Sequence, residues 1–178
     1  EGTDPNTTIL TFDMFANRIG EDGRRIGTFA TPTVSIEADD FTADCITFAN
    51  TAGNQGQALA IAVHGDRVVF RNCRFLGYQD TLFTPTGRHY FKDCYIEGRT
   101  DFIFGGSTAF FDTCRIHCIG GSYITAASTA PNQQWGYVFM HCTITAASPT
   151  DKTYLGRPWR DYAAVMFLYT EMSGIIRP

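Results

Sequence analysis

Apolar residues along this chain fall in short runs, and the runs do not repeat with the i, i+3, i+4, i+7 spacing of an amphipathic helix. They are rich in aromatic and β-branched residues and are separated by Gly, Asn, Asp, Pro and Thr, which is typical of strands joined by turns. The pattern predicts short β-strands at residues 33–36, 45–48, 68–70, 90–91, 109–111, 137–139 and 164–168.

A longer pattern repeats along the chain. The segment 70–83 matches the segment 91–104 at six paired positions: Phe70 and Phe91, Cys73 and Cys94, Phe75 and Ile96, Gly77 and Gly98, Asp80 and Asp101, Phe83 and Phe104. Further copies begin at Phe111 and Phe139, and they contain Cys114 and Cys142 at the position of Cys94. Cys45 precedes Cys73 by the same step that separates Cys114 from Cys142, and we expect it to belong to the same series.

A repeat of roughly 20–28 residues made of short strands and turns indicates a β-solenoid, in which each copy is one coil stacked on the last. The sequence therefore predicts an all-β fold, a right-handed parallel β-helix, as a single domain over residues 1–178. Stacked strands lie about 4.8 Å apart, so equivalent positions on successive coils form ladders of side chains.

The six cysteines admit three interpretations. A ladder of buried, mostly reduced thiols is favoured, because cysteine behaves as a small hydrophobe inside a core. Neighbouring ladder positions are also close enough for one disulfide. A zinc site is the least favoured interpretation, and its candidate ligands are Cys114, His117, Cys118, His141 and Cys142.

Composition and charge narrow the classes of partner. The chain has 178 residues, 44% of them hydrophobic, which is ample for one core. Its net charge of -4 and its lack of a Lys/Arg block argue against a nucleic-acid or membrane-surface partner. No apolar run approaches the ~18 residues of a membrane span. The first residues lack the pattern of a signal peptide, so any targeting segment is expected outside this sequence.

Asp80 and Asp101 are the strongest candidates for chemistry, because the repeat places them at equivalent positions on adjacent coils. Two carboxyl groups on neighbouring coils do not both ionise easily, so one tends to keep its proton while the other is an anion. That division suits an acid/base group beside a nucleophile. The alternative is that both aspartates only cap the turns that follow Gly77 and Gly98.

Four segments carry a resemblance to a known family, in the right order and at about the right spacing: residues 50–53 with 57–60, 77–82, 101–105 and 155–159. In these segments the sequence resembles the pectin methylesterases, and the similarity extends from about Gly27 to Pro178. That family has a parallel β-helix fold, so the resemblance agrees with the repeat.

The resemblance implies a role for each catalytic candidate. Asp101 would attack the C6 carbonyl of a methyl galacturonate, and Asp80 would serve as general acid and then as general base. Gln57 and Gln79 would donate amide hydrogen bonds to the oxyanion, and Arg157 would hydrogen-bond Asp101. Gln55 is the alternative to Gln57.

The resemblance also implies that Trp159, Phe83 and Phe104 offer apolar faces to sugar rings, with help from Tyr78. Phe83 and Phe104 are equivalent in the repeat, so a purely structural aromatic stack is the alternative for them. Trp159 lies in a Gly-Arg-Pro-Trp turn, which favours exposure and hence binding.

By the same resemblance, we expect an enzyme without cofactor or metal that acts as a monomer on methyl-esterified pectin outside the cell, or in the periplasm if bacterial. Family members carry further residues before the first strand and after the last, so we expect part of a catalytic domain with uncapped ends. Two other functions stay open, because a fold does not fix an activity. One is a pectin-degrading glycosidase or lyase, and the other is a non-catalytic pectin-binding β-helix.

Overall fold

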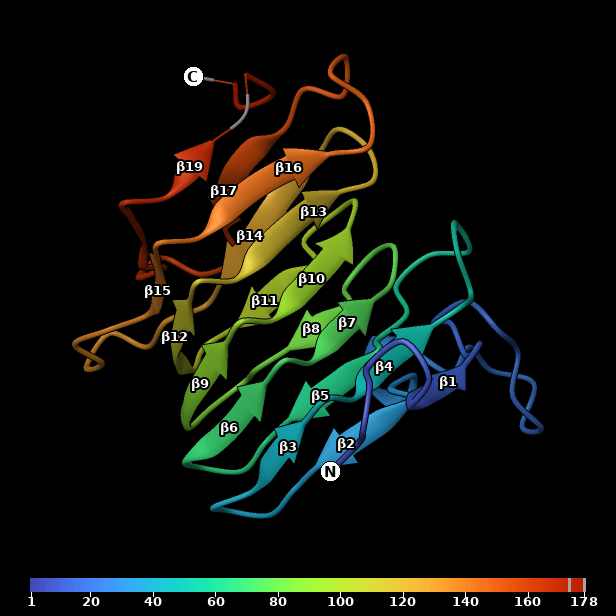
Figure 1. The fold of residues 1–178 in the computed structure, drawn as a ribbon. Coiled ribbons are helices and arrows are strands. Elements are labelled where there is room, and N and C mark those ends of the chain that lie inside the picture. Colours follow the sequence, from blue (N-terminus) through green and yellow to red (C-terminus); the bar gives the residue numbers. More distant parts are fainter. Residues whose placement is uncertain (173, 178) are drawn as a thin grey trace.

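The computed structural model describes residues 1–172 and 174–177 (Figure 1). Within them the strands form three sheets, and the single short 3-10 helix is η1 (Thr28–Ala30). The first sheet has seven strands, in the spatial order β1 (Ile9–Phe12), β4 (Thr47–Asn50), β7 (Arg74–Leu76), β10 (Tyr95–Gly98), β13 (Arg115–Cys118), β16 (Thr143–Ala146) and β19 (Glu171–Met172).

The other two sheets have six strands each. The second sheet contains β2 (Val34–Ile36), β5 (Ile61–Val63), β8 (Leu82–Phe83), β11 (Ile103–Gly105), β14 (Tyr123–Ala127) and β17 (Tyr154–Pro158). The third sheet contains β3 (Thr42–Asp44), β6 (Val68–Arg71), β9 (Arg88–Lys92), β12 (Thr108–Asp112), β15 (Tyr137–Met140) and β18 (Val165–Leu168).

Consecutive strands pass from one sheet to the next, and every third strand returns to the same sheet and pairs in parallel with the one before it. Each coil therefore gives one strand to each sheet. The predicted parallel β-helix is confirmed, and the chain climbs it from β1 to β19 (Figure 1). No helix among the described residues is long and apolar enough to cross a membrane.

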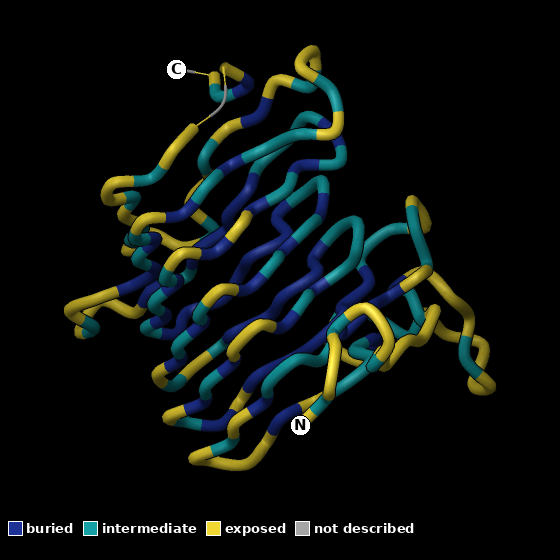
Figure 2. The backbone as a smooth tube through the Cα atoms, viewed as in Figure 1, coloured by how far each residue is buried: buried dark blue, intermediate teal, exposed yellow. Residues whose placement is uncertain are grey.

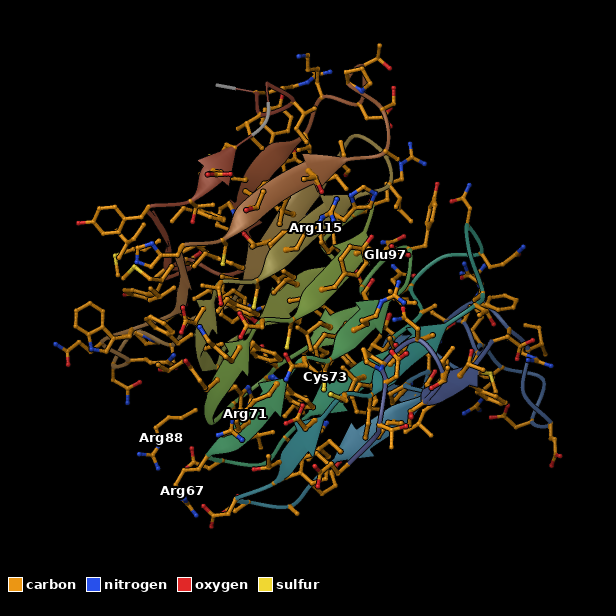
Figure 3. The ribbon with its side chains drawn as sticks, viewed as in Figure 1. Arg67, Arg71, Cys73, Arg88, Glu97 and Arg115 are labelled. Atoms are coloured by element: carbon orange, nitrogen blue, oxygen red, sulfur yellow. The ribbon has the colours of Figure 1, made fainter. Side chains whose placement is uncertain are left out.

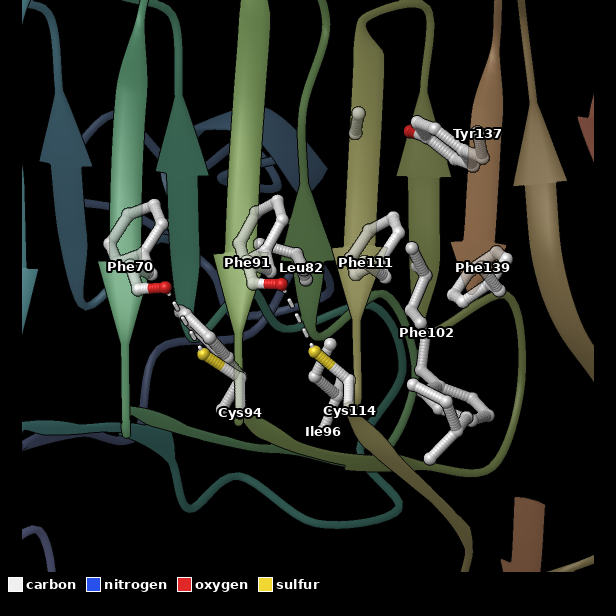
Figure 4. Close-up of a cluster of buried hydrophobic side chains, with 14 of the residues drawn as sticks. Phe70, Leu82, Phe91, Cys94, Ile96, Phe102, Phe111, Cys114, Tyr137 and Phe139 are labelled. Atoms are coloured by element: carbon white, nitrogen blue, oxygen red, sulfur yellow. Dashed lines mark hydrogen bonds between the residues drawn. The ribbon is translucent and has the colours of Figure 1, made fainter. Parts of the chain in front are cut away.

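The interior is built from rows of side chains at equivalent positions. Five phenylalanines of the third sheet stack with ring centroids 4.4 to 5.2 Å apart: Phe70, Phe91, Phe111, Phe139 and Phe167. Figure 4 shows four of these rings in line. Buried residues follow the strands, while exposed residues gather at the turns and in the N-terminal segment (Figure 2). Burial of these rows is the main stabilisation expected of such a core.

The cysteine ladder contains four residues, not five. Cys73, Cys94, Cys114 and Cys142 are buried and free, one on each coil. The Sγ of Cys94 donates to the carbonyl of Phe70 at 3.6 Å, and that of Cys114 to Phe91 at 3.4 Å (Figure 4).

The prediction that Cys45 continues this ladder was wrong. Asp44 pairs with Arg71 and Thr47 with Arg74, so Ile46 takes the position of Cys73 on this coil. Cys45 instead occupies the left-handed turn position, with φ 56°, that Asn72 occupies on the next coil with φ 52°. It is free and partly exposed.

Loops of different length explain the uneven repeat. The step from Cys94 to Cys114 is short, because only residues 106–107 join β11 to β12. The step from Cys114 to Cys142 is long, because the loop 128–136 joins β14 to β15. The strands stay in register since insertions enter the loops, where extra residues cost little. The coils can therefore differ in length without disturbing the second sheet, on whose outer face the candidate site lies.

Candidate active site

A cleft of about 280 Å³ lies on the second sheet, lined by residues from successive coils. The loops before β5, β8 and β11 contribute polar side chains, and η1 contributes two lining residues. Its lining is Thr28, Phe29, Gln57, Gln79, Asp80, Asp101, Phe104, Ala126, Arg157 and Trp159. Seven of these residues were predicted from the sequence, and the structure brings them together.

Asp80 and Asp101 occupy equivalent positions on consecutive coils, as the repeat predicted. The register of β8 with β11 pairs Leu82 with Ile103, which is the same offset that separates the two aspartates. Both aspartates are buried, with 8% and 4% of their surface exposed. Both also have a left-handed backbone, with φ of 65° and 50°. The same conformation recurs at turn positions of other coils, such as Asn72 and Asp93, so it belongs to the turn that presents each carboxylate.

The turn that presents Asp101 explains the glycine three residues before it. A Cβ on Gly98 would lie 2.2 Å from the Cβ of Phe102, so no larger residue fits there. The chain can therefore turn tightly enough to bury Phe102 and direct Asp101 into the cleft.

Gln57 and Gln79 form the adjacent polar ladder. Gln57 pairs with Gln79 and Gln79 pairs with Thr100, each one residue before the aspartate position. Both glutamines line the cleft. Gln55 does not line it; that residue is exposed, and its carbonyl accepts a 3.4 Å hydrogen bond from Asn17. The geometry thus favours Gln57 over Gln55.

Arg157, on β17, contacts Asp101 directly. Its Nε donates to Oδ1 at 2.9 Å, and its Nη2 donates to Oδ2 at 2.6 Å. A forked, charge-assisted pair of this kind fixes both direction and distance. The glycine before Arg157 is required by close packing, because a Cβ on Gly156 would lie 2.1 Å from the Oγ1 of Thr125.

The electrostatics of the cleft distinguish the two aspartates. Burial, followed by the negative charge of Asp101, raises the pKa of Asp80 to about 7, although the nearby Arg157 acts in the opposite direction. Asp80 therefore keeps its proton up to about pH 7, while Asp101 faces the guanidinium. A proton donor and a charge-paired carboxylate are placed side by side, which is the arrangement needed for nucleophilic catalysis with general acid help.

Aromatic rings line one side of the cleft. Phe104 lies 5.8 Å from Trp159 and 4.6 Å from Phe83, measured between ring centroids. Phe104 and Trp159 reach the cleft lining, whereas Phe83, the neighbour of Phe104 on β8, is buried and does not line the cleft. Phe29 packs against Phe83 at 5.0 Å and is 59% exposed. Sequence reasoning missed Phe29, because it lies outside the repeat and no motif marks it.

Tyr78 is not brought into the cleft. Its hydroxyl accepts a 2.8 Å hydrogen bond from the Nη1 of Arg99, whose guanidinium also lies over its ring. It lines a separate pocket with Asn50 and Glu97. The implied contact of Tyr78 with substrate therefore has no support in this geometry. Metal ligation was the other open interpretation, and within residues 1–172 and 174–177 no three His, Cys, Asp or Glu side chains converge as a metal site requires.

Fold and cleft together define a parallel β-helix protein with a paired-aspartate site, and known proteins share both sequence and structure with it. A sequence model of the Pectinesterase family matches residues 5–178. The chain belongs to the pectinesterase family. It is 47% identical to Pectinesterase 31 of Arabidopsis thaliana over 99% of this chain and 57% of that protein. It is 45% identical to Pectinesterase A of Emericella nidulans over 96% of this chain and 52% of that protein.

Solved structures agree. A pectin methylesterase in complex with hexasaccharide VII superposes with a TM-score of 0.91 and 30% identity, over 99% of this chain and 64% of the other. The pectin methylesterase from carrot gives a TM-score of 0.90 and 34% identity, over 99% and 58%. The chain spans little more than half the length of the two relatives named above.

Proposed function

We propose that this chain carries the catalytic site of an extracellular, monomeric pectin methylesterase, which converts methyl-esterified galacturonate units to free carboxylate and methanol. One observation carries the proposal: in a single cleft, Asp101 is paired with Arg157 beside Asp80, whose pKa is raised to about 7. Membership of the pectinesterase family supports the choice of substrate.

In the first half of the reaction, a carboxylate oxygen of Asp101 attacks the C6 carbonyl carbon. The amide N–H groups of Gln57 and Gln79 donate to the oxyanion that forms, and such donors usually contribute much of the acceleration in acyl transfer. The bond from C6 to the methoxy oxygen then breaks. Asp80 gives its proton to that oxygen, so methanol leaves and an anhydride joins C6 to Asp101.

In the second half, Asp80 is ionised and takes a proton from water. The resulting hydroxide attacks C6, and the bond from C6 to Asp101 breaks. A free galacturonic acid unit and the original Asp101 carboxylate result, and Asp80 again holds a proton. The sum is one ester and one water converted to one acid and one methanol. A group that gives and then takes a proton works best with a pKa near the operating pH, as Asp80 has.

Product analysis tests the proposal. Highly methylated pectin is incubated with the protein, with and without EDTA, and methanol, new reducing ends and unsaturated ends are measured. We expect methanol alone, with an unchanged rate in EDTA. New reducing ends as the main product would indicate a glycosidase, and unsaturated ends a lyase. Binding of pectin without any product would indicate the non-catalytic β-helix, and each of these results would reject the esterase.

A further inference from the structure

Arg157 and Asp101 are not on neighbouring coils. In the second sheet β14 lies between β17, which carries Arg157, and β11, which Asp101 precedes. Tyr123 is the first residue of β14, so it lies on the coil between Asp101 and Arg157. The Cζ of Arg157 lies 5.7 Å from the centre of the Tyr123 ring. The carbonyl of Tyr123 accepts a 2.7 Å hydrogen bond from the backbone N–H of Asp101.

We propose that Tyr123 is a positioning residue, whose ring holds the guanidinium of Arg157 where it can hydrogen-bond the carboxylate of Asp101. The kinetic consequences rest on the function proposed above, but the contact itself does not. A guanidinium over an aromatic ring is attracted by the electron density of the ring face.

The exposure of Arg157 is the reason why it needs such a support. Its side chain is 49% exposed, while the side chain of Asp101 is 6% exposed. A long, half-exposed side chain has many rotamers, and holding it in one of them costs conformational entropy. The ring below the guanidinium favours the rotamer that reaches Asp101, because other rotamers lose the cation–π contact.

Tyr123 is itself held in place. The ring of Tyr154, on the next coil, stacks on it with centroids 5.2 Å apart. The guanidinium of Arg177 lies 5.7 Å from the centre of the Tyr154 ring. The register of β11 with β14 makes Tyr123 the equivalent of Asp101 on the next coil. Two stacked tyrosines therefore continue the row of side chains that Asp101 belongs to.

A double-mutant cycle tests the proposal. Tyr123→Leu and Tyr123→Phe are made in the wild type and in Arg157→Ala. The titratable groups that face the guanidinium are Asp101, Asp80 and the Tyr123 phenol. Two readouts are taken: the pH profile of kcat/KM on methylated pectin, and the titration of the aspartates by carboxyl 13C NMR, which requires no turnover.

In the wild-type background, Tyr123→Leu should lower kcat/KM roughly two- to five-fold near the acid limb, the size expected for one exposed cation–π contact. The apparent pKa of Asp80 should rise by roughly 0.3 to 0.7, the same factor on a logarithmic scale, because the charge of Arg157 acts to lower it. Tyr123→Phe keeps the ring and should restore both quantities. In the Arg157→Ala background, Tyr123→Leu should change neither, because the residue it acts through is gone.

Tyr95→Leu is the matched control. Tyr95 lies on β10 in the first sheet with the guanidinium groups of Arg74 and Arg115 at 5.3 and 6.0 Å from its ring centre. Figure 3 labels Arg115 and Glu97 on that sheet. This variant loses the same kind of contact away from the cleft, and it should leave the titration of the cleft aspartates unchanged.

Equal effects of Tyr123→Leu in both backgrounds would overturn the proposal, and so would an unchanged titration in the wild-type background. A change confined to KM that persists in Arg157→Ala would show instead that Tyr123 contacts substrate. If the wild type released no methanol, the proposed function would fail, and the NMR titration would still decide whether Tyr123 positions Arg157.

Discussion

The carboxylate of Asp101 is almost fully buried, yet its partner Arg157 has a side chain that is half exposed. A buried anion without a partner is costly, so the fork from Arg157 compensates a charge that the fold alone would disfavour. The exposed edge of the guanidinium leaves the cleft open to a ligand. The pair therefore holds the Asp101 carboxylate in a fixed position at the cleft that both residues line.

Removing Arg157 should change the pH dependence more than the affinity. The guanidinium favours the anionic forms in the cleft, and it opposes the rise in the pKa of Asp80. In Arg157→Ala that opposition is lost, and because a coupled pair titrates as a unit, the acid limb of the kcat/KM profile should move to higher pH. Arg157→Lys should restore it only partly, because lysine lacks the planar fork. The measurement is kcat/KM against pH for the three proteins.

The alternative is that Arg157 binds substrate and does not control the ionisation of the pair. If Arg157→Ala left the acid limb in place and raised only KM, Arg157 would bind the substrate, and another group would have to control the ionisation of the pair. Arg67 is a suitable control, since it pairs with Asp40 and Asp66 on the surface. Arg67→Ala should leave the profile unchanged.

Replacing the carboxylates should separate chemistry from folding. Asp101→Asn is nearly isosteric, and asparagine tolerates the left-handed backbone, but the amide is a poor nucleophile. We expect methanol release to be abolished in Asp101→Asn and severely slowed in Asp80→Asn, with unchanged circular dichroism. Asp93→Asn is the matched control, because Asp93 also has a positive φ, of 53°, but is exposed. Either catalytic variant retaining more than about a tenth of the activity, a loss of ~1.4 kcal/mol, would contradict its role.

The glutamine ladder predicts a loss in kcat. Gln57→Ala and Gln79→Ala should each lower kcat by about 10²–10³, the usual effect of removing one oxyanion donor, with little change in KM. Gln55→Ala is the control, since Gln55 lies outside the cleft. Steady-state kinetics on methylated pectin provide the measurement. A change in KM alone would assign that glutamine to substrate binding.

The sequence could predict the β-helix coils and the proximity of the two aspartates, because the repeat sets which residues pair between neighbouring coils. Equivalent positions on successive coils lie one strand spacing apart, so the offset of Asp101 from Asp80 fixes their proximity without knowledge of the loops. The contact of Arg157 with Asp101 is different. It spans a coil of irregular length, and its prediction depended on the resemblance to a family.

Three features lay beyond the repeat for identifiable reasons. Phe29 reaches the cleft from η1, where no repeated position marks it. Tyr78 precedes two cleft residues, but its ring contacts Arg99 instead of the cleft. Cys45 misses the ladder by one position, because strand pairing matches Asp44 with Arg71, and a count between cysteines cannot reveal such a shift.

Asp80 should destabilise the folded protein as the pH rises. Its pKa is raised from 3.8 to about 7 on folding, first by burial and then by Asp101. A group whose pKa is raised on folding adds stability below its unfolded pKa and loses that contribution as the pH passes its folded pKa. The penalty for ionising Asp80 in the cleft therefore grows from about pH 4 and is complete above pH 7.

Asp80→Asn should thus be more stable than the wild type at pH 8, and this advantage should fade toward pH 4. The difference between the two pH values should be on the order of 2–4 kcal/mol in the free energy of unfolding, since one pKa unit corresponds to about 1.4 kcal/mol. Urea unfolding of both proteins at pH 4, 6 and 8 measures it. The buried His89, whose pKa is lowered by burial, is common to both proteins and cancels in the comparison. Asp93→Asn should show no such pH-dependent gain. An advantage of Asp80→Asn that was the same at pH 4 and pH 8 would mean that the folded protein does not hold the proton on Asp80, and the general acid would have to be sought elsewhere in the cleft.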